Sequence, residues 1–97
     1  MTIEEYLVDV REIYYQMSAR VKGKQILVGS RTHRLTDVRD SNGVLNTIRF
    51  ATSTGSVLSL PAAIKVDETY FDRAAINFGG VRLVIWPVKE MSDDIRG

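Results

Sequence analysis

The chain has 97 residues, of which 44% are hydrophobic and 26% charged, with no cysteine, one histidine and a formal net charge of +1. A chain this short forms a single domain, and its apolar fraction is that of a folded protein rather than a disordered one. The lack of cysteine excludes disulfides, thiolate metal sites and thiol catalysis, and a lone histidine argues against a zinc or copper site built from protein ligands.

Two features of the sequence predict where the protein works. No apolar run approaches the roughly 20 residues that a membrane span requires. The first ten residues are acidic and amphipathic, which is unlike a secretory signal. We therefore expect a cytoplasmic protein with no membrane partner, made of one domain over residues 1–88 and a frayed acidic tail over residues 89–97.

The first predicted element is a long helix over residues 3–21. Thr2 and Glu5 have the spacing of a capping box, in which each side chain accepts a hydrogen bond from an N–H group at the helix start. Apolar residues then recur at intervals of three and four, at Ile3, Leu7, Val10, Tyr14, Met17 and Val21. This spacing is typical of a helix with one apolar face, and Gly23 is a suitable end. The same stripe also fits a dimer seam, which we keep as an alternative.

The middle of the chain predicts an antiparallel meander. Apolar and polar residues alternate with a period of two, and turn residues separate the runs. The strongest turn is Asp40–Gly43, where Asn42 and Gly43 favour the positive φ angles of a hairpin. The expected strands cover residues 25–28, 32–39, 44–52 and 57–60, and Pro61 closes the last one.

The segment 67–78 allows two structures. Asp67 can cap a helix that ends at Gly79, whereas the Gly79–Gly80 pair can join two strands as a hairpin. We favour the helix because the segment starts with acidic residues and contains a pair of alanines. Residues 81–88 are apolar on both faces, as in a central strand. The predicted fold class is α+β, with a long N-terminal helix packed on a four- to five-stranded antiparallel sheet and a short second helix before the last strand.

Charge is segregated along the chain. Residues 1–19 carry four acids and one base, residues 20–49 carry seven bases and two acids, and residues 50–97 carry five bases and six acids. The three net charges are therefore −3, +5 and −1. A basic block of this kind favours anionic partners, although it would also suit contact with the acidic N-terminal helix.

The basic block includes a predicted strand with no apolar face. Residues 32–39 hold only Leu35 and Val38 as apolar side chains, a pattern typical of an edge strand or a protruding hairpin. Arginine side chains bind carboxylates and phosphates in a bidentate manner. The predicted binding residues are Lys24, Arg31, His33, Arg34, Arg39 and Arg49. The alternative is that these charges only keep an edge strand soluble.

Aromatic residues offer a second surface. Tyr15 falls off the predicted helical stripe, so we expect it to be exposed, where it would anchor a protein partner. The alternative for Tyr14, Tyr15 and Trp86 is a place in the core with the polar group in water.

The sequence carries no specific motif for catalysis. His33 is a candidate general base, because the flanking Arg31 and Arg34 would lower its pKa and hold an anionic substrate, and a plain surface histidine is the alternative. The glycines form neither a P-loop nor a dinucleotide fingerprint, and no nucleophile elbow is present. We expect no cofactor and no metal.

These observations lead to three hypotheses about function. The first is a small non-catalytic binding module whose arginine-bearing hairpin docks onto an anionic partner: a nucleic acid, a nucleotide-like ligand or an acidic protein surface. The alternative is a protein inhibitor or a homo-oligomeric assembly subunit that acts through the apolar helix stripe and the aromatic residues. The third is a hydrolase-type enzyme centred on His33.

Overall fold

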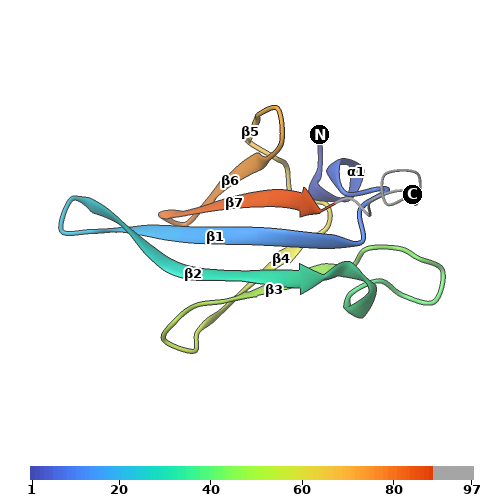
Figure 1. The fold of residues 1–97 in the computed structure, drawn as a ribbon, viewed down its shortest axis with the longest axis horizontal. Coiled ribbons are helices and arrows are strands. Elements are labelled where there is room, and N and C mark those ends of the chain that lie inside the picture. Colours follow the sequence, from blue (N-terminus) through green and yellow to red (C-terminus); the bar gives the residue numbers. More distant parts are fainter. Residues whose placement is uncertain (89–97) are drawn as a thin grey trace, which may run out of the picture.

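The computed structural model describes residues 1–88, and antiparallel strands make up most of it (Figure 1). The tail expected at residues 89–97 lies outside the described residues. The elements in chain order are α1 (Ile3–Tyr6), β1 (Glu12–Val21), β2 (Lys24–Arg34), the 3-10 turn η1 (Leu35–Asp37), β3 (Thr47–Ala51), β4 (Val57–Pro61), β5 (Glu68–Thr69), β6 (Ala74–Phe78) and β7 (Val81–Val88). They form a five-stranded sheet in the order β2-β1-β7-β6-β5 and a two-stranded sheet of β3 and β4. The α+β prediction is therefore wrong, because the fold is mostly β.

The predicted N-terminal helix ends after about one turn. Its capping box is confirmed, since the Thr2 hydroxyl accepts a hydrogen bond from the Glu5 N–H and the Glu5 carboxylate accepts one from the Thr2 N–H. From Glu12 onward the chain is strand β1, which pairs with β2 on one side and β7 on the other. Backbone pairing with two neighbours overrides the helical spacing of the local sequence.

Burial along β1 follows a period of two. Ile13, Tyr15 and Met17 are buried, whereas Tyr14 and Gln16 lie on the opposite face and are half-buried. This alternation is that of a strand, and isoleucine and tyrosine both favour strands. Because Tyr14 and Met17 lie on opposite faces, the apolar helix stripe and the dimer seam built on it do not exist.

The second predicted helix is also wrong, and the hairpin alternative is confirmed. β6 and β7 pair in antiparallel register across Gly79 and Gly80, whose φ angles are 56° and 82°. Glycine adopts such positive angles without the steric cost that other residues meet. The alanines expected in a helix, Ala74 and Ala75, are instead buried in β6. β7 lies between β1 and β6, in the central position that its apolar sequence predicted.

The turns expected around residues 40–43 and 53–56 are confirmed, whereas the break expected at residues 29–30 is wrong. The first two expected strands form one strand, β2, which ends at Arg34 where η1 begins. β2 is an edge strand of the five-stranded sheet, but the polar edge strand predicted over residues 32–39 belongs to it only at residues 32–34, because η1 follows at Leu35. In the turn at residues 40–43, the Asp40 carboxylate accepts hydrogen bonds from the N–H groups of Asn42 and Val44 at 2.8 and 2.9 Å.

The β1–β2 hairpin extends beyond the rest of the sheet. β7 pairs with β1 only as far as Ala19, whereas β1 and β2 continue to the turn at Lys22 and Gly23. These two residues have φ angles of 51° and 78°, which suit a two-residue hairpin turn. Figure 1 shows this turn at the end of the molecule opposite α1, and we call residues 20–25 the hairpin tip.

The β3–β4 hairpin docks on the large sheet through Tyr15. The ring of Tyr15 packs edge-on against Phe50, with 4.8 Å between ring centroids. Its hydroxyl donates a hydrogen bond to the Ala51 carbonyl at 2.8 Å and accepts one from the Ala51 N–H at 3.0 Å. Next to this contact, the Ser53 N–H donates to the carbonyl of Val28. We call this contact between β1, β2 and the end of β3 the Tyr15 crossing.

Gly29 lies in the crossing and leaves no room for a side chain. A Cβ atom at this position would stand 2.5 Å from the carbonyl oxygen of Ala51, which belongs to the backbone. We expect Gly29→Ala to lower the free energy of unfolding by about 1–3 kcal/mol, the usual cost of overpacking. Urea denaturation measures this loss, and Thr32→Ala, at an exposed position of β2, is a control that should change stability by less than about 0.5 kcal/mol.

Tyr15→Phe tests the hydroxyl of the crossing. The variant keeps the packing against Phe50 and leaves the Ala51 N–H and C=O without their partner, so we expect a loss of about 1–3 kcal/mol in urea denaturation. Tyr14→Phe is the matched control, because the Tyr14 hydroxyl bonds to the exposed Ser30 and its removal should cost less. Equal losses in the two variants would contradict the role given to the crossing.

Candidate functional site

The register of β1 and β2 decides which face each predicted binding residue occupies. Arg31 lies opposite Tyr15 and His33 lies opposite Ile13. Directly opposed residues of an antiparallel pair share a face. Arg31 and His33 are therefore on the face that packs against the β3–β4 hairpin, whereas Arg34 is on the other face of the same strand.

A hollow of about 410 Å³ lies where β2, η1 and β3 meet. Its lining residues are His33, Asp37, Val38, Asn46, Thr47 and Arg49. The fold thus places His33 and Arg49 at one site, although 15 residues separate them in the sequence. We call Arg31, His33, Arg34 and Arg49 the cationic edge.

His33 is half-buried and lines this site. Its ring lies 6.3 Å from the ring of Phe50, and its Nε2 atom is buried without a hydrogen-bond partner among the described residues. Burial is the main cause that lowers the pKa of His33, the charge of Arg31 lowers it further, and Asp37 opposes both. The predicted direction is confirmed, but its chief cause is desolvation rather than the flanking arginines.

The three arginines of the cationic edge are exposed. Within the described residues, none of them forms an ion pair closer than 4.0 Å. Arg34 faces Glu12 across the strand pair, and Asp37 is the acidic side chain that lines the hollow. Such unpaired guanidinium groups are available for bidentate contact with carboxylates or phosphates.

Arg39 does not belong to the cationic edge. Its guanidinium donates hydrogen bonds to the carbonyls of Leu7 at 2.8 Å, Val10 at 3.1 Å and Gly43 at 3.1 Å. These bonds tie the α1–β1 connection to the turn at residues 40–43. Arg39 is therefore a structural residue, whose guanidinium group is hydrogen-bonded to backbone carbonyl oxygens of the same chain.

Two other predicted binding residues are also placed elsewhere. Tyr15 is fully buried in the crossing, so the prediction that it is exposed is wrong. The wrong helix caused this error, because alternation in a strand puts Tyr15 and not Tyr14 on the core face. Lys24 is exposed at the hairpin tip, nine residues along β2 from His33, which is about 30 Å at roughly 3.3 Å per residue.

The sequence did not single out the polar residues of the hollow. Asn46 and Thr47 line it beside Arg49, and their place depends on how the β3–β4 hairpin crosses the sheet. The alternation of residues 44–52 contained a partial signal, since it separated Arg49 from the buried Ile48 and Phe50. No spacing in the sequence indicated that these residues would meet His33.

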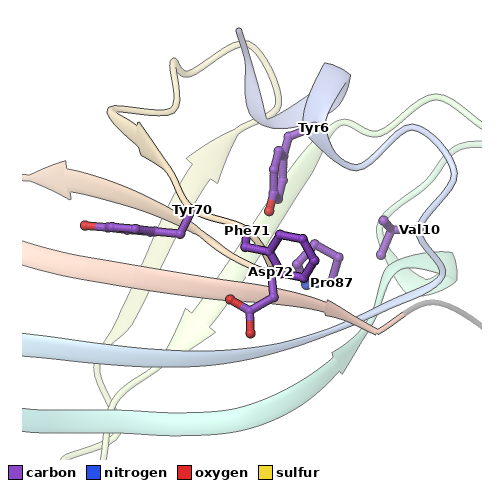
Figure 2. Close-up of a pocket in the computed structure, with 6 residues that line it drawn as sticks. All are labelled: Tyr6, Val10, Tyr70, Phe71, Asp72 and Pro87. Carbon is purple, nitrogen blue, oxygen red and sulfur yellow. The ribbon is translucent and has the colours of Figure 1, made fainter.

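A second hollow was also missed, and it lies at the α1 end of the molecule (Figure 2). Its volume is about 430 Å³. It is lined by Tyr6, Val10, Tyr70, Phe71, Asp72 and Pro87, and we call it the aromatic pocket. The sequence analysis assigned Phe71 to the apolar face of a helix, which would be buried. In the structure Phe71 is fully exposed in the loop between β5 and β6.

The contacts of His33 bear on its predicted role as a general base. No hydrogen bond joins His33 to Asp37 or Thr47 in the described part of the chain. A general base that activates a hydroxyl group needs such a contact.

Across residues 1–88, no group of three or more His, Cys, Asp or Glu side chains is arranged to hold a metal ion. In the same range, no helix is long and apolar enough to cross a membrane.

The lowered pKa of His33 predicts a pH dependence of stability. An unfolded His33 titrates near 6.5, so the unfolded chain binds more protons than the folded one just below that pH. The contribution of neutral His33 to stability is therefore complete above about pH 6.5 and is lost as the pH falls through the lower folded pKa. We expect His33→Gln to lose less free energy of unfolding than the wild type between about pH 7.5 and about pH 5.

Urea denaturation of both proteins at each pH measures this difference. The carboxylates titrate alike in both proteins, so their contribution to the pH dependence of the free energy of unfolding cancels in the comparison. Parallel stability curves for the two proteins would contradict the burial of a neutral His33.

Comparisons with protein-family models, with curated proteins and with solved structures gave no match to this chain.

Proposed function

We propose that this protein is a small non-catalytic binding module whose cationic edge docks onto an acidic surface of another protein. The observation that carries the proposal is that Arg31 shares a face of β2 with His33 and that Arg49 lines the same hollow as His33, while Arg34 lies on the opposite face of the strand. Among the described residues, none of the three guanidinium groups forms an ion pair. Carboxylates of a partner would supply the bidentate contacts that these groups lack.

The position of the cationic edge supports docking of a protein surface. β2 is an edge strand, and its charged side chains keep it from pairing with another copy of itself. The same charges would attract an acidic partner and speed its association. The polar residues Asn46 and Thr47 beside Arg49 add hydrogen-bonding groups to the hollow.

The aromatic residues near the edge favour a protein partner over single-stranded nucleic acid. Proteins that bind single strands stack bases on exposed rings. Phe50 is fully buried, and Tyr14 packs on Trp86 with 5.5 Å between centroids while its hydroxyl bonds to Ser30. The rings of Phe50, Tyr14 and Trp86 are thus engaged with other residues of the chain. The lack of cysteine in the sequence suits a cytoplasmic setting for this contact.

The test uses a fluorescent peptide of consecutive glutamates and follows its anisotropy. We expect binding to weaken steeply between about 50 and about 200 mM salt, because the contacts are exposed and ionic. Arg31→Ala and Arg49→Ala should each weaken binding about fivefold, which corresponds to about 1 kcal/mol per exposed ion pair.

Lys24→Ala is the matched control, since it removes one positive charge about 30 Å from His33 along β2. It should change the affinity by less than about twofold. A flat salt dependence, or equal effects of Lys24→Ala and Arg49→Ala, would contradict the proposed site. Tighter binding of an oligothymidylate than of the peptide would contradict the choice of an acidic protein as partner.

A further inference from the structure

The aromatic pocket combines exposed rings with one carboxylate. Phe71 is fully exposed, Tyr70 is 43% exposed and Tyr6 is half-buried. Asp72 is the charged residue of the lining. Figure 2 shows the Tyr6 ring pointing from α1 toward the loop that carries Phe71 and Asp72. Ring faces and a carboxylate together favour a cation on an apolar stem, such as a lysine side chain.

The Asp72 carboxylate is accessible to such a cation. Its side chain is 60% exposed, and its contact with the Nε atom of Arg73 is 3.7 Å long. An exposed pair of this kind contributes little stability. The Arg73 guanidinium carbon lies 5.5 Å from the ring centroids of both Tyr70 and Trp86, so the rings hold it in place. Burial, and then the charge of Asp72, raise the pKa of Tyr6, which places that charge near the Tyr6 ring.

The hairpin tip has the complementary chemistry. It carries Arg20, Lys22 and Lys24, and no acidic residue occurs between Glu12 and Asp37. Val21, in the same turn, is 44% exposed. The positive φ angles of the turn fix its shape before any contact is made. The tip therefore presents basic groups on apolar stems from a preformed projection.

The two features lie at opposite ends of the molecule. The aromatic pocket includes Val10 and Pro87 at the α1 end of the sheet, whereas the tip lies past the last β1–β7 pair. From Val10 to Val21 the chain advances about 36 Å at roughly 3.3 Å per residue, and the longest dimension of the molecule is 48 Å. The tip therefore cannot enter the pocket of its own chain.

We propose that the aromatic pocket receives the hairpin tip of a second copy of this chain, with Lys22 placed beside Asp72. Such a contact joins two different surfaces, so it repeats head to tail and produces a ring or an open chain of copies. The contact involves none of the residues of the cationic edge, and its failure would leave the proposed acidic partner unaffected.

A pair of charge reversals tests this assembly by sedimentation from micromolar to millimolar concentration. Asp72→Lys places a base in the pocket, and Lys22→Glu places an acid on the tip. Each variant alone then brings like charges together at the contact. We expect each to associate at least tenfold more weakly than the wild type.

Mixing the two variants in equal amounts provides the decisive result. The unchanged tip of the Asp72→Lys chain meets the unchanged pocket of the Lys22→Glu chain. At the second contact, the carboxylate introduced at position 22 meets the ammonium group introduced at position 72. We expect the mixture to regain the association of the wild type. Lys65→Glu is the matched control, because this exposed residue belongs to neither the pocket nor the tip, and it should associate like the wild type.

Phe71→Ala separates association from folding. The ring is fully exposed, so its loss should leave thermal stability unchanged and weaken association at least tenfold. A wild-type chain that stays monomeric at millimolar concentration would overturn the proposal. A mixture of the charge reversals that associates no better than either variant alone would also overturn it.

Discussion

The Tyr15 crossing is the contact on which the arrangement of this small domain depends. One buried hydroxyl satisfies both the N–H and the C=O of Ala51, and the glycine beside it lets the β3 backbone approach the edge strand closely. Buried polar groups are costly unless they are paired, so the bonds to Ala51 fix where β3 lies on the sheet. The position of β3 in turn fixes where Arg49 stands relative to Arg31 and His33. The core contact and the surface site are therefore parts of one arrangement.

The sequence was informative wherever a structural signal was local. The capping box at Thr2 and Glu5, the turn at residues 40–43 and the edge position of residues 32–34 all follow from side-chain chemistry within a few residues. The glycine pair at residues 79–80 also carried a correct signal, since it needs positive φ angles. The preference for a helix in the segment before it rested on composition, and the pairing of β6 with β7 overrode that composition.

The N-terminal helix shows why the remaining features were not predictable. The spacing of Val10, Tyr14 and Met17 is helical by coincidence, because Tyr14 faces away from the core that contains Met17. The choice between helix and strand was decided by pairing on both sides of β1. β2 pairs through the turn at Lys22 and Gly23, where the glycine was interpreted as a helix end, and β7 pairs from more than 60 residues away along the chain. The candidate site also depended on contacts that are distant in the sequence. The register of β1 and β2 places Arg34 on the opposite face of β2 from Arg31 and His33. The Tyr15 crossing brings Asn46 and Thr47 to the hollow that His33 lines.

The fold distributes the basic residues of the sequence over separate parts of the surface. The basic block of residues 20–49 is divided by distance, with the hairpin tip at one end of β2 and the cationic edge at the other. Arg39 contributes to neither basic surface, because its guanidinium group donates hydrogen bonds to the carbonyl groups of residues 7, 10 and 43. The small net charge thus conceals two separate basic surfaces, each of which has a distinct proposed partner.

The most direct test of the central claim is a titration of the isotope-labelled protein with the glutamate peptide, followed by amide chemical shifts. If the Tyr15 crossing assembles one binding site from β2 and β3, the amides of residues 31–34 and 46–49 shift together with a single affinity. Shifts confined to residues 20–25, or shifts of β2 without those of β3, would contradict this account.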